Sequence, residues 1–317
     1  MIMAASRAGR EGILPMEAES RRTVVVAMAA NFGVAIAKLV AASVTGSSAM
    51  LAEAFHAVAD TGNEALLLVA QWRGGKPADE RHPLGHGREA YFWALIASLA
   101  VFVTGALLSL RQGINQLMNP VETAHFPVAY IVLVVSFGLD GMSLFRAYRQ
   151  IKGEAAILRR DFFEHFELTS DPVARAVFAE DTAALAGNLI ALSGIALHQA
   201  TGSSVPDGVA AILIAMLLAY VAFELAKRNR DFIIGQQVAA PLKATVREII
   251  AAQPGIVAVG ELLVTFLGPR RVWVVARIDI DDGMSGAQVK EALRAAEDEL
   301  KRRSPYIARA YLMPSGV

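Results

Sequence analysis

Four ionisable side chains lie at helical spacing within residues 51–70. Glu53, His56, Asp60 and Glu64 recur every three or four residues, so a helix would present all of them along one face. His56 and Asp60 would supply an imidazole nitrogen and a carboxylate from adjacent turns, which is half of a tetrahedral zinc site. Glu53 and Glu64 fit hydrogen bonding between helices, or a position near a helix end, at least as well.

A second acidic group, Glu180 and Asp181, stands in front of an apolar stretch. Neighbouring residues on a helix point about 100° apart, so one of the two could readily share an ion with His56 and Asp60. We prefer Glu180 for this role. The alternative for either carboxylate is that it complements the positive end of a helix.

A short polar segment holds two further histidines, His82 and His86, four residues apart and beside Asp79 and Glu80. This arrangement allows a peripheral metal site, since imidazole and carboxylate are both zinc ligands. The alternative is that these loop histidines are solvated or hydrogen-bonded. The chain has no cysteine, so thiolate sites and disulfides are excluded and any metal must be bound by His, Asp, Glu, backbone or water.

The elements that must position these groups are membrane helices. Hydrophobic residues make up 55% of the 317 residues, above the roughly 45–50% of soluble domains, and the mean hydropathy is +0.43. The formal net charge is zero, which argues against a nucleic-acid partner. A bilayer core needs about 20 apolar residues in a helix. Six spans qualify, at residues 24–44, 49–70, 90–114, 126–145, 173–200 and 209–225.

The second and fifth spans carry carboxylates, each of which costs about 2.5–3.5 kcal/mol near a helix centre on the insertion scale. Residues 1–22 lack the apolar core and cleavage site of a signal peptide, so we expect a disordered leader. Asp207, at the start of the sixth span, is predicted to be a helix cap, with an entry-path carboxylate as the other interpretation.

Lys and Arg mark one side of the membrane. They lie in the leader, between the second and third spans, between the fourth and fifth, and after the sixth, whereas residues 45–48, 115–125 and 201–207 contain none. By the positive-inside tendency, both termini are expected in the cytoplasm, which requires an even number of spans. We therefore expect an integral multi-pass protein, with a bacterial inner membrane as its place.

Residues 232–317 have the character of a small soluble domain. Helices are predicted at residues 242–253 and 286–303, the second capped by Ser285, and strands at 257–266, 272–281 and 307–313. This order fits an α+β split-βαβ sandwich with two helices on one sheet face. The expected fold class is thus a six-helix transmembrane bundle, residues 23–231, followed by a ferredoxin-like cytoplasmic domain. The uncovered sheet face would suit a dimer contact.

Three segments resemble the cation diffusion facilitator family of metal–proton antiporters in their sequence, order and spacing. They are GSSAMLAEAFHAVADTGNEALL, HPLGHGREAYFWALIASLAVF and VPDGVAAILIAMLLAYVAFELAK. The tail resembles the cytoplasmic domain of that family. The segment at the start of the fifth span most resembles the branch that includes the mitochondrial and nuclear zinc-transporter-like member of animals. Its sequence is SDPVARAVFAEDTAALAG. The resemblance covers nearly everything after residue 21.

The resemblance implies a homodimer, with a metal site halfway through the membrane in each protomer and His56 and Asp60 as ligands. The family's second His-xxx-Asp or Asp-xxx-Asp is absent from the fifth span, where Glu180 and Asp181 take its place. His82 and His86 match loop histidines of members with a second zinc site. The tail has no His and no Cys, so the family's cytoplasmic zinc pair is not expected.

The function expected on this basis is a zinc–proton antiporter that exports the ion from the cytoplasm by alternating access. The donor set also tolerates manganese or iron(II), which leaves a carrier of those ions as an alternative. A regulatory scaffold without transport is a third possibility, because of the altered fifth span. An enzyme is not expected, since neither an HExxH helix nor a G-x-S-x-G turn occurs, and no resident cofactor is predicted.

Overall fold

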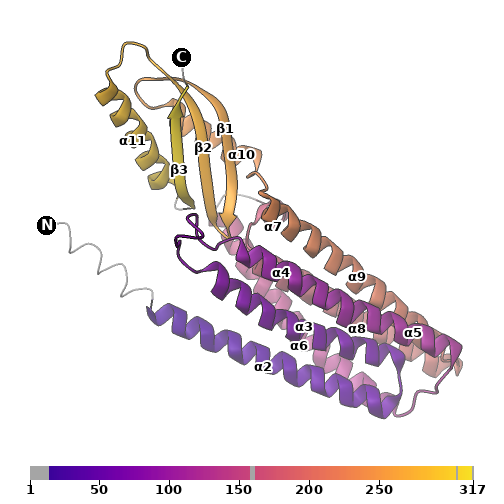
Figure 1. The fold of residues 1–317 in the computed structure, drawn as a ribbon. Coiled ribbons are helices and arrows are strands. Elements are labelled where there is room, and N and C mark those ends of the chain that lie inside the picture. The colour runs from indigo at the N-terminus through magenta and orange to yellow at the C-terminus, as the bar shows by residue number, and fades with distance from the viewer. Residues whose placement is uncertain (1–13, 158–160, 305, 316–317) are drawn as a thin grey trace. The chain divides into compact units, whose positions relative to one another are not determined.

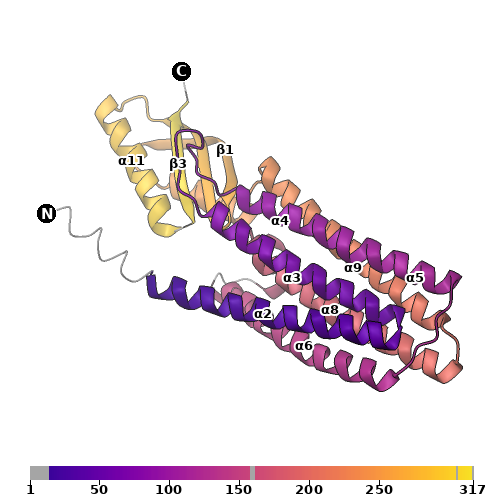
Figure 2. The ribbon, with the colours of Figure 1, turned by 60° about the horizontal axis from the view of Figure 1, so that its bottom comes forward.

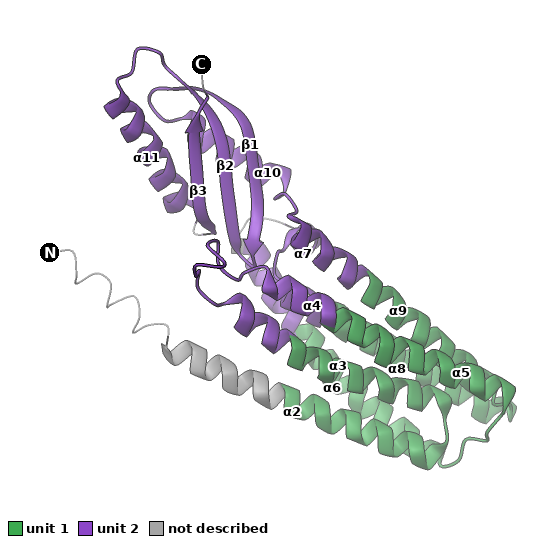
Figure 3. Ribbon diagram, viewed as in Figure 1, with its two compact units in different colours: residues 1–66, 97–145, 179–223 green, residues 67–96, 146–178, 224–317 purple. Residues whose placement is uncertain are grey.

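The computed structural model describes residues 14–157, 161–304 and 306–315, and it consists of a helical region followed by a small α+β region (Figure 1). The chain divides into two compact units (Figure 3). Unit 1 contains residues 1–66, 97–145 and 179–223, and unit 2 contains residues 67–96, 146–178 and 224–317. Each unit therefore combines segments from distant parts of the sequence.

Long helices account for most of the chain before the tail. Five of them, in whole or in part, are long and apolar enough to cross a membrane within the described residues, which makes this a helical transmembrane region. In chain order the helical elements are α2 (Leu14–Thr45), α3 (Ser48–Gly74), α4 (Glu89–Ala100), η1 (Val101–Leu107), α5 (Leu108–Met118), α6 (Phe126–Ile157), α7 (Phe162–Leu168), α8 (Pro172–Thr201) and α9 (Val205–Ile234).

Helix α3 is the remaining predicted span. It is 27 residues long, enough for a bilayer core, but it is not among the five helical stretches that are also apolar enough to cross a membrane. Its acidic side chains lower its hydropathy, as expected from the sequence. Figures 1 and 2 show α3 beside α2 in the helical region, so its polar face has neighbouring helices to contact.

Small residues let the helices of unit 1 approach closely. Its core is rich in alanine, and on α8 a Cβ added at Gly194 would overlap Ala210 of α9. Membrane helices pack by such close contacts because lipid offers no hydrophobic driving force between them. A π-helical stretch, η1, joins α4 to α5, and within it Gly105 faces Ala59 and Leu218.

Asp207 is a helix cap, as predicted, but of a different helix. It belongs to α9, yet its carboxylate accepts hydrogen bonds from the Ser47 hydroxyl at 2.6 Å and from the backbone N–H groups of Ser48 and Ala49 at 2.5 and 3.3 Å. It thus satisfies unpaired donors at the N-terminus of α3. Local sequence could not indicate this, because the partners lie about 160 residues apart.

The tail forms the predicted α+β domain. Its elements are α10 (Ala240–Ala251), β1 (Ile256–Gly268), β2 (Arg271–Ile280), α11 (Gly286–Arg303) and β3 (Ile307–Pro314). The strands pair in the order β1-β2-β3, with β1 antiparallel and β3 parallel to β2. The parallel pair is joined by α11, whose N-terminus is closed by a capping box between Ser285 and Gln288.

Three features differ from the sequence-based expectations. Several helices extend beyond the predicted spans; α6, for example, continues to Ile157 rather than residue 145. Helix α7 was not predicted, because it is only 7 residues long and lies in the connection between two spans. Of the expected leader, residues 1–13 lie outside the described residues, and residues 14–22 belong to α2.

Candidate metal centre

A cluster of buried and half-buried polar side chains lies in unit 1 and draws on four helices. Polar groups inside a membrane protein face the bundle interior, since lipid cannot solvate them, and usually mark a functional path. The members are Lys38 of α2; Glu53, His56, Asp60, Asn63 and Glu64 of α3; Asp140 and Ser143 of α6; and Glu180, Asp181 and Asn188 of α8.

His56 lies between two carboxylates of its own helix. Its Nε2 is 3.3 Å from Asp60 Oδ2 and its Nδ1 is 3.7 Å from Glu53 Oε1. The ring is 1% exposed, and neither nitrogen forms a hydrogen bond with any residue that the structure describes. Opposite this group, α8 has Gly187, where an added Cβ would overlap Glu53 Oε1 and lie 3.7 Å from His56 Nδ1. The absent side chain therefore makes room for the acid and the imidazole.

Glu180 and Asp181 project toward different helices, as the 100° between adjacent residues requires. Glu180 is buried and accepts a hydrogen bond from Asn63 Nδ2 of α3 at 2.6 Å through Oε2. Asp181 accepts one from the Ser143 hydroxyl of α6 at 2.7 Å. Glu180 therefore faces the helix that carries His56 and Asp60, which supports our preference for it.

Within the part of the chain that the structure describes, several buried atoms of the cluster have no hydrogen-bond partner, among them His56 Nε2, Asp60 Oδ1 and Glu180 Oε1. Buried polar atoms are normally paired, so such a group requires an explanation. A divalent cation would satisfy the unpaired nitrogen and oxygen atoms, which is the chemistry for which this arrangement is suited.

In the described structure His56 Nε2, Asp60 Oδ1 and Glu180 Oε1 are not close enough together to coordinate one ion. Among the described residues, the group of three or more potential ligands within 4.8 Å of one another is Asp79, His82 and His86, in the loop. Binding of an ion by His56, Asp60 and Glu180 therefore requires their side chains, on α3 and α8, to move closer together.

Sequence reasoning missed five members of the cluster: Lys38, Asn63, Asp140, Ser143 and Asn188. Lys38 is 2% exposed and bonded to Glu53, and Asn188 donates to Asp140 at 2.8 Å. A lysine inside an apolar span was a usable signal, because a charge there is costly and needs a partner. Glu53 and Glu64 do make contacts between helices, Glu53 with Lys38 and Glu64 with Asn31, as one interpretation of the sequence expected.

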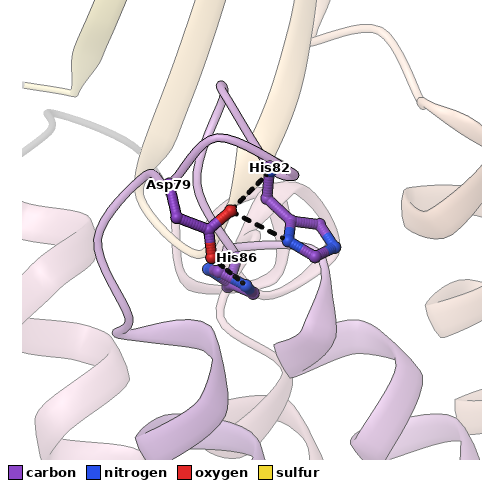
Figure 4. A group of neighbouring side chains, drawn as sticks. All are labelled: Asp79, His82 and His86. Atoms are coloured by element: carbon purple, nitrogen blue, oxygen red, sulfur yellow. Dashed lines mark hydrogen bonds and ion pairs between the residues drawn. The ribbon is translucent and has the colours of Figure 1, made fainter.

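The loop between α3 and α4 brings the second pair of histidines together around one carboxylate (Figure 4). Asp79 Oδ1 lies 3.2 Å from His82 Nδ1, and Asp79 Oδ2 lies 3.5 Å from His86 Nε2. The imidazole rings are 4.2 Å apart between centroids. Glu80, which also neighbours the histidines in sequence, is not part of this group.

The loop backbone holds this group in a form that suits a metal. Asp79 Oδ1 accepts the backbone N–H of His82 at 2.6 Å, and this bond is the main reason that the pKa of Asp79 lies below its usual range. His86 Nδ1 lies 3.1 Å from the Pro77 carbonyl oxygen, which can only accept a hydrogen bond, and its Nε2 faces Asp79 Oδ2. One carboxylate and two imidazoles are a donor set that fits zinc.

The helical region is similar in sequence to a known family of membrane proteins. The model of the cation efflux transmembrane domain matches residues 24–234. The mitochondrial proton-coupled zinc antiporter of Xenopus laevis is 29% identical over 260 residues, which are 82% of this chain and 46% of that protein. Metal tolerance protein C4 of Arabidopsis thaliana is 31% identical over 217 residues, 68% of this chain and 48% of that protein.

The chain thus spans about half the length of these two relatives. A cation-efflux pump of Cronobacter sakazakii is 25% identical over 273 residues, which cover 85% of this chain and 84% of the pump. The family match covers well over half of the sequence, includes every helix of the buried polar cluster, and describes a transporter domain rather than an enzyme. The chain belongs to the cation efflux family.

Proposed function

We propose that this protein exchanges zinc for protons across a membrane, at a site formed by His56, Asp60 and Glu180. One observation carries the proposal: His56 Nε2, Asp60 Oδ1 and Glu180 Oε1 are buried in a membrane-spanning unit and have no hydrogen-bond partner among the described residues. An imidazole nitrogen and two carboxylate oxygens leave a fourth position of a tetrahedron for water. The zinc antiporter named among the relatives supports zinc as the ion.

Protons compete with zinc for the same atoms. Metal binding needs neutral imidazole and ionised carboxylates, so a bound ion displaces protons and protonation releases the ion. In alternating access, the site would open to one side with zinc bound and to the other with protons bound. The inward movement of α3 and α8 side chains that coordination requires would distinguish these two states.

The test is zinc uptake into proteoliposomes with an imposed pH gradient, compared metal by metal with manganese and iron(II). Wild-type protein is expected to transport zinc and to depend on the gradient. Asp60→Asn should abolish transport, whereas Asp298→Asn, which removes an exposed carboxylate from α11, should not change it. Equal transport by folded Asp60→Asn protein would refute the site, and a higher rate with manganese would favour the carrier alternative. No flux of any ion would favour the regulatory scaffold.

The direction of transport is proposed to be export from the cytoplasm. The protein is proposed to lie in a bacterial inner membrane with both termini in the cytoplasm. The excess of Lys and Arg on one set of connections supports this orientation. The loop group of Asp79, His82 and His86 is proposed to bind a second ion and to tune entry. It lies at the connection between α3 and α4, among those that carry basic residues.

A homodimer is proposed as the assembled form, with the sheet of the tail as part of the contact. Leu263, Val275 and Tyr311 pair across the three strands and form one row on the sheet. Leu263 and Tyr311 are 45% and 43% exposed, while the adjacent row of Leu262, Ala276 and Leu312 is buried. An apolar row on the open face of a sheet is suited to contact a second copy.

A further inference from the structure

Lys38 is a charged side chain in an unusual place. It lies within the apolar part of α2, at residues 28–45, and is 2% exposed. A lysine inside the membrane is costly unless it is paired, and long side chains near a helix end would normally reach for water instead. Lys38 instead points into the cluster that contains the proposed zinc site.

The ammonium of Lys38 lies between carboxylates from two other helices. Its Nζ is 2.9 Å from Glu53 Oε2 on α3 and 4.0 Å from Asp140 Oδ2 on α6. Asp140 Oδ2 is also bonded to Asn188 of α8 at 2.8 Å, which fixes its orientation. The positive charge of this ammonium therefore compensates two carboxylates, Glu53 and Asp140, at once.

Glu53 lies next to a proposed ligand, and Asp140 is linked to Glu53 through Lys38. Glu53 Oε1 is 3.7 Å from His56 Nδ1, and Asp140 Oδ2 is 4.0 Å from Lys38 Nζ. If they were free, rotation of their side chains would offer two more hard oxygen donors to an ion at His56 and Asp60. Carboxylate-rich sites suit manganese and magnesium, whereas imidazole with fewer carboxylates suits zinc.

We propose that Lys38 is a specificity-determining residue of the cation site, because it pairs with Glu53, faces Asp140, and so withholds both carboxylates from the ion. This inference rests on the proposed function of the same site. It also gives Glu53 a second role: with Oε2 held by Lys38, Oε1 remains available to accept the Nδ1 proton of His56 and leave Nε2 for the metal. Such carboxylate–imidazole pairs orient metal-binding histidines in many proteins.

The test compares the dissociation constants of zinc and manganese, by titration calorimetry, for purified full-length variants in detergent. Lys38→Met keeps the length of the side chain and removes its charge. It should lower the ratio of the manganese constant to the zinc constant by about tenfold, the lower end of the range for losing a group around a metal site. Lys38→Arg keeps the charge and should retain the wild-type ratio. Lys152→Met, the same change at an exposed position of α6, should also retain it.

Two double variants keep the proposal falsifiable if Lys38→Met folds poorly. Lys38→Met with Glu53→Gln, and Lys38→Met with Asp140→Asn, each remove a positive and a negative charge together. Recovery of the wild-type ratio in either one supports the proposal and identifies the acid that Lys38 withholds. An unchanged ratio in Lys38→Met overturns it, as does a lowered ratio that neither double variant corrects. Absence of zinc binding by wild-type protein would instead refute the proposed function.

Discussion

Asn63 of α3 donates a hydrogen bond to Glu180 of α8, with 2.6 Å between Nδ2 and Oε2. Both side chains are buried, and the bond leaves the other carboxylate oxygen of Glu180 unpaired. It therefore orients one oxygen toward α3 and frees the second for another partner. The neighbouring Asp181 is bonded to Ser143 of α6 instead, so two adjacent acids have different environments.

This difference predicts unequal effects of removing the two acids. Glu180→Gln should abolish zinc transport and weaken zinc binding by more than about 100-fold, the most that loss of an orienting group usually costs. Asp181→Asn should weaken binding by about tenfold or less, because it leaves the Glu180 oxygen in place. Both replacements preserve side-chain size, and calorimetry with transport in proteoliposomes would measure them. Equal and mild effects would place the ligand of α8 elsewhere.

Gly187 gives a second prediction. Gly187→Ala would put a methyl group where Glu53 Oε1 lies and so displace the carboxylate that stands 3.7 Å from His56 Nδ1. Zinc affinity should fall by about 10–100-fold while the helix itself remains intact, since alanine favours helix formation. Gly138→Ala on α6 is the matched control, because nothing lies within 4 Å of a Cβ added there. The same zinc affinity in both variants and the wild type would show that His56 does not need this space.

Much of the fold could be predicted from local pattern. Apolar runs of about 20 residues and period-2 strands are set by nearby residues, which is why helices lie at the predicted spans, five of them in stretches long and apolar enough to cross a membrane, and why the α-β-β-α-β order of the tail is confirmed. Helix ends were less accurate. Helix α9, for example, extends to Ile234, beyond the apolar part that the prediction used, because polar residues continue a helix once it leaves the bilayer core.

The site was harder to predict, because its geometry depends on contacts between helices. His56 and Asp60 could be found from a spacing of four within one segment. The bond between Lys38 and Glu53 joins two helices, and the bond between Asn63 and Glu180 joins residues 117 positions apart. No local pattern indicates such a pairing. The sequence does show charged residues within apolar spans, where a charge is costly and needs a partner. Lys38 is one of them and indicates a buried ion pair.

The loop group is predicted to be secondary to transport. Replacing His82 and His86 together with Ala should leave measurable zinc flux, because these side chains lie outside the apolar spans. The double variant should bind one zinc ion fewer than wild type in calorimetry, and Glu80→Ala should bind the same number as wild type, since Glu80 is not in the group. Complete loss of flux by a normally folded double variant would contradict this ranking.

The proposed orientation can be tested by labelling, because the natural chain has no cysteine and provides a clean background. Glu122→Cys lies between α5 and α6, in a connection without Lys or Arg, and should react with a membrane-impermeant maleimide on intact cells. Asp298→Cys on α11 should react only in inverted vesicles. The opposite pattern would place the tail outside, and labelling of both sites on intact cells would contradict the expected topology.

The row of Leu263, Val275 and Tyr311 predicts where a dimer would be weakened. Tyr311→Glu replaces an aromatic ring by a charged side chain that contact with a second copy would have to desolvate, so the dimer dissociation constant should rise by about tenfold or more, a change of 1.4 kcal/mol or more. Ala295→Glu places the same side chain at an exposed position of α11 and should leave the constant unchanged. Deletion of the tail from residue 237 should weaken the dimer further. Mass photometry in detergent would report the fraction of dimer, and an unchanged population of monomers with and without the tail would rule out this contact.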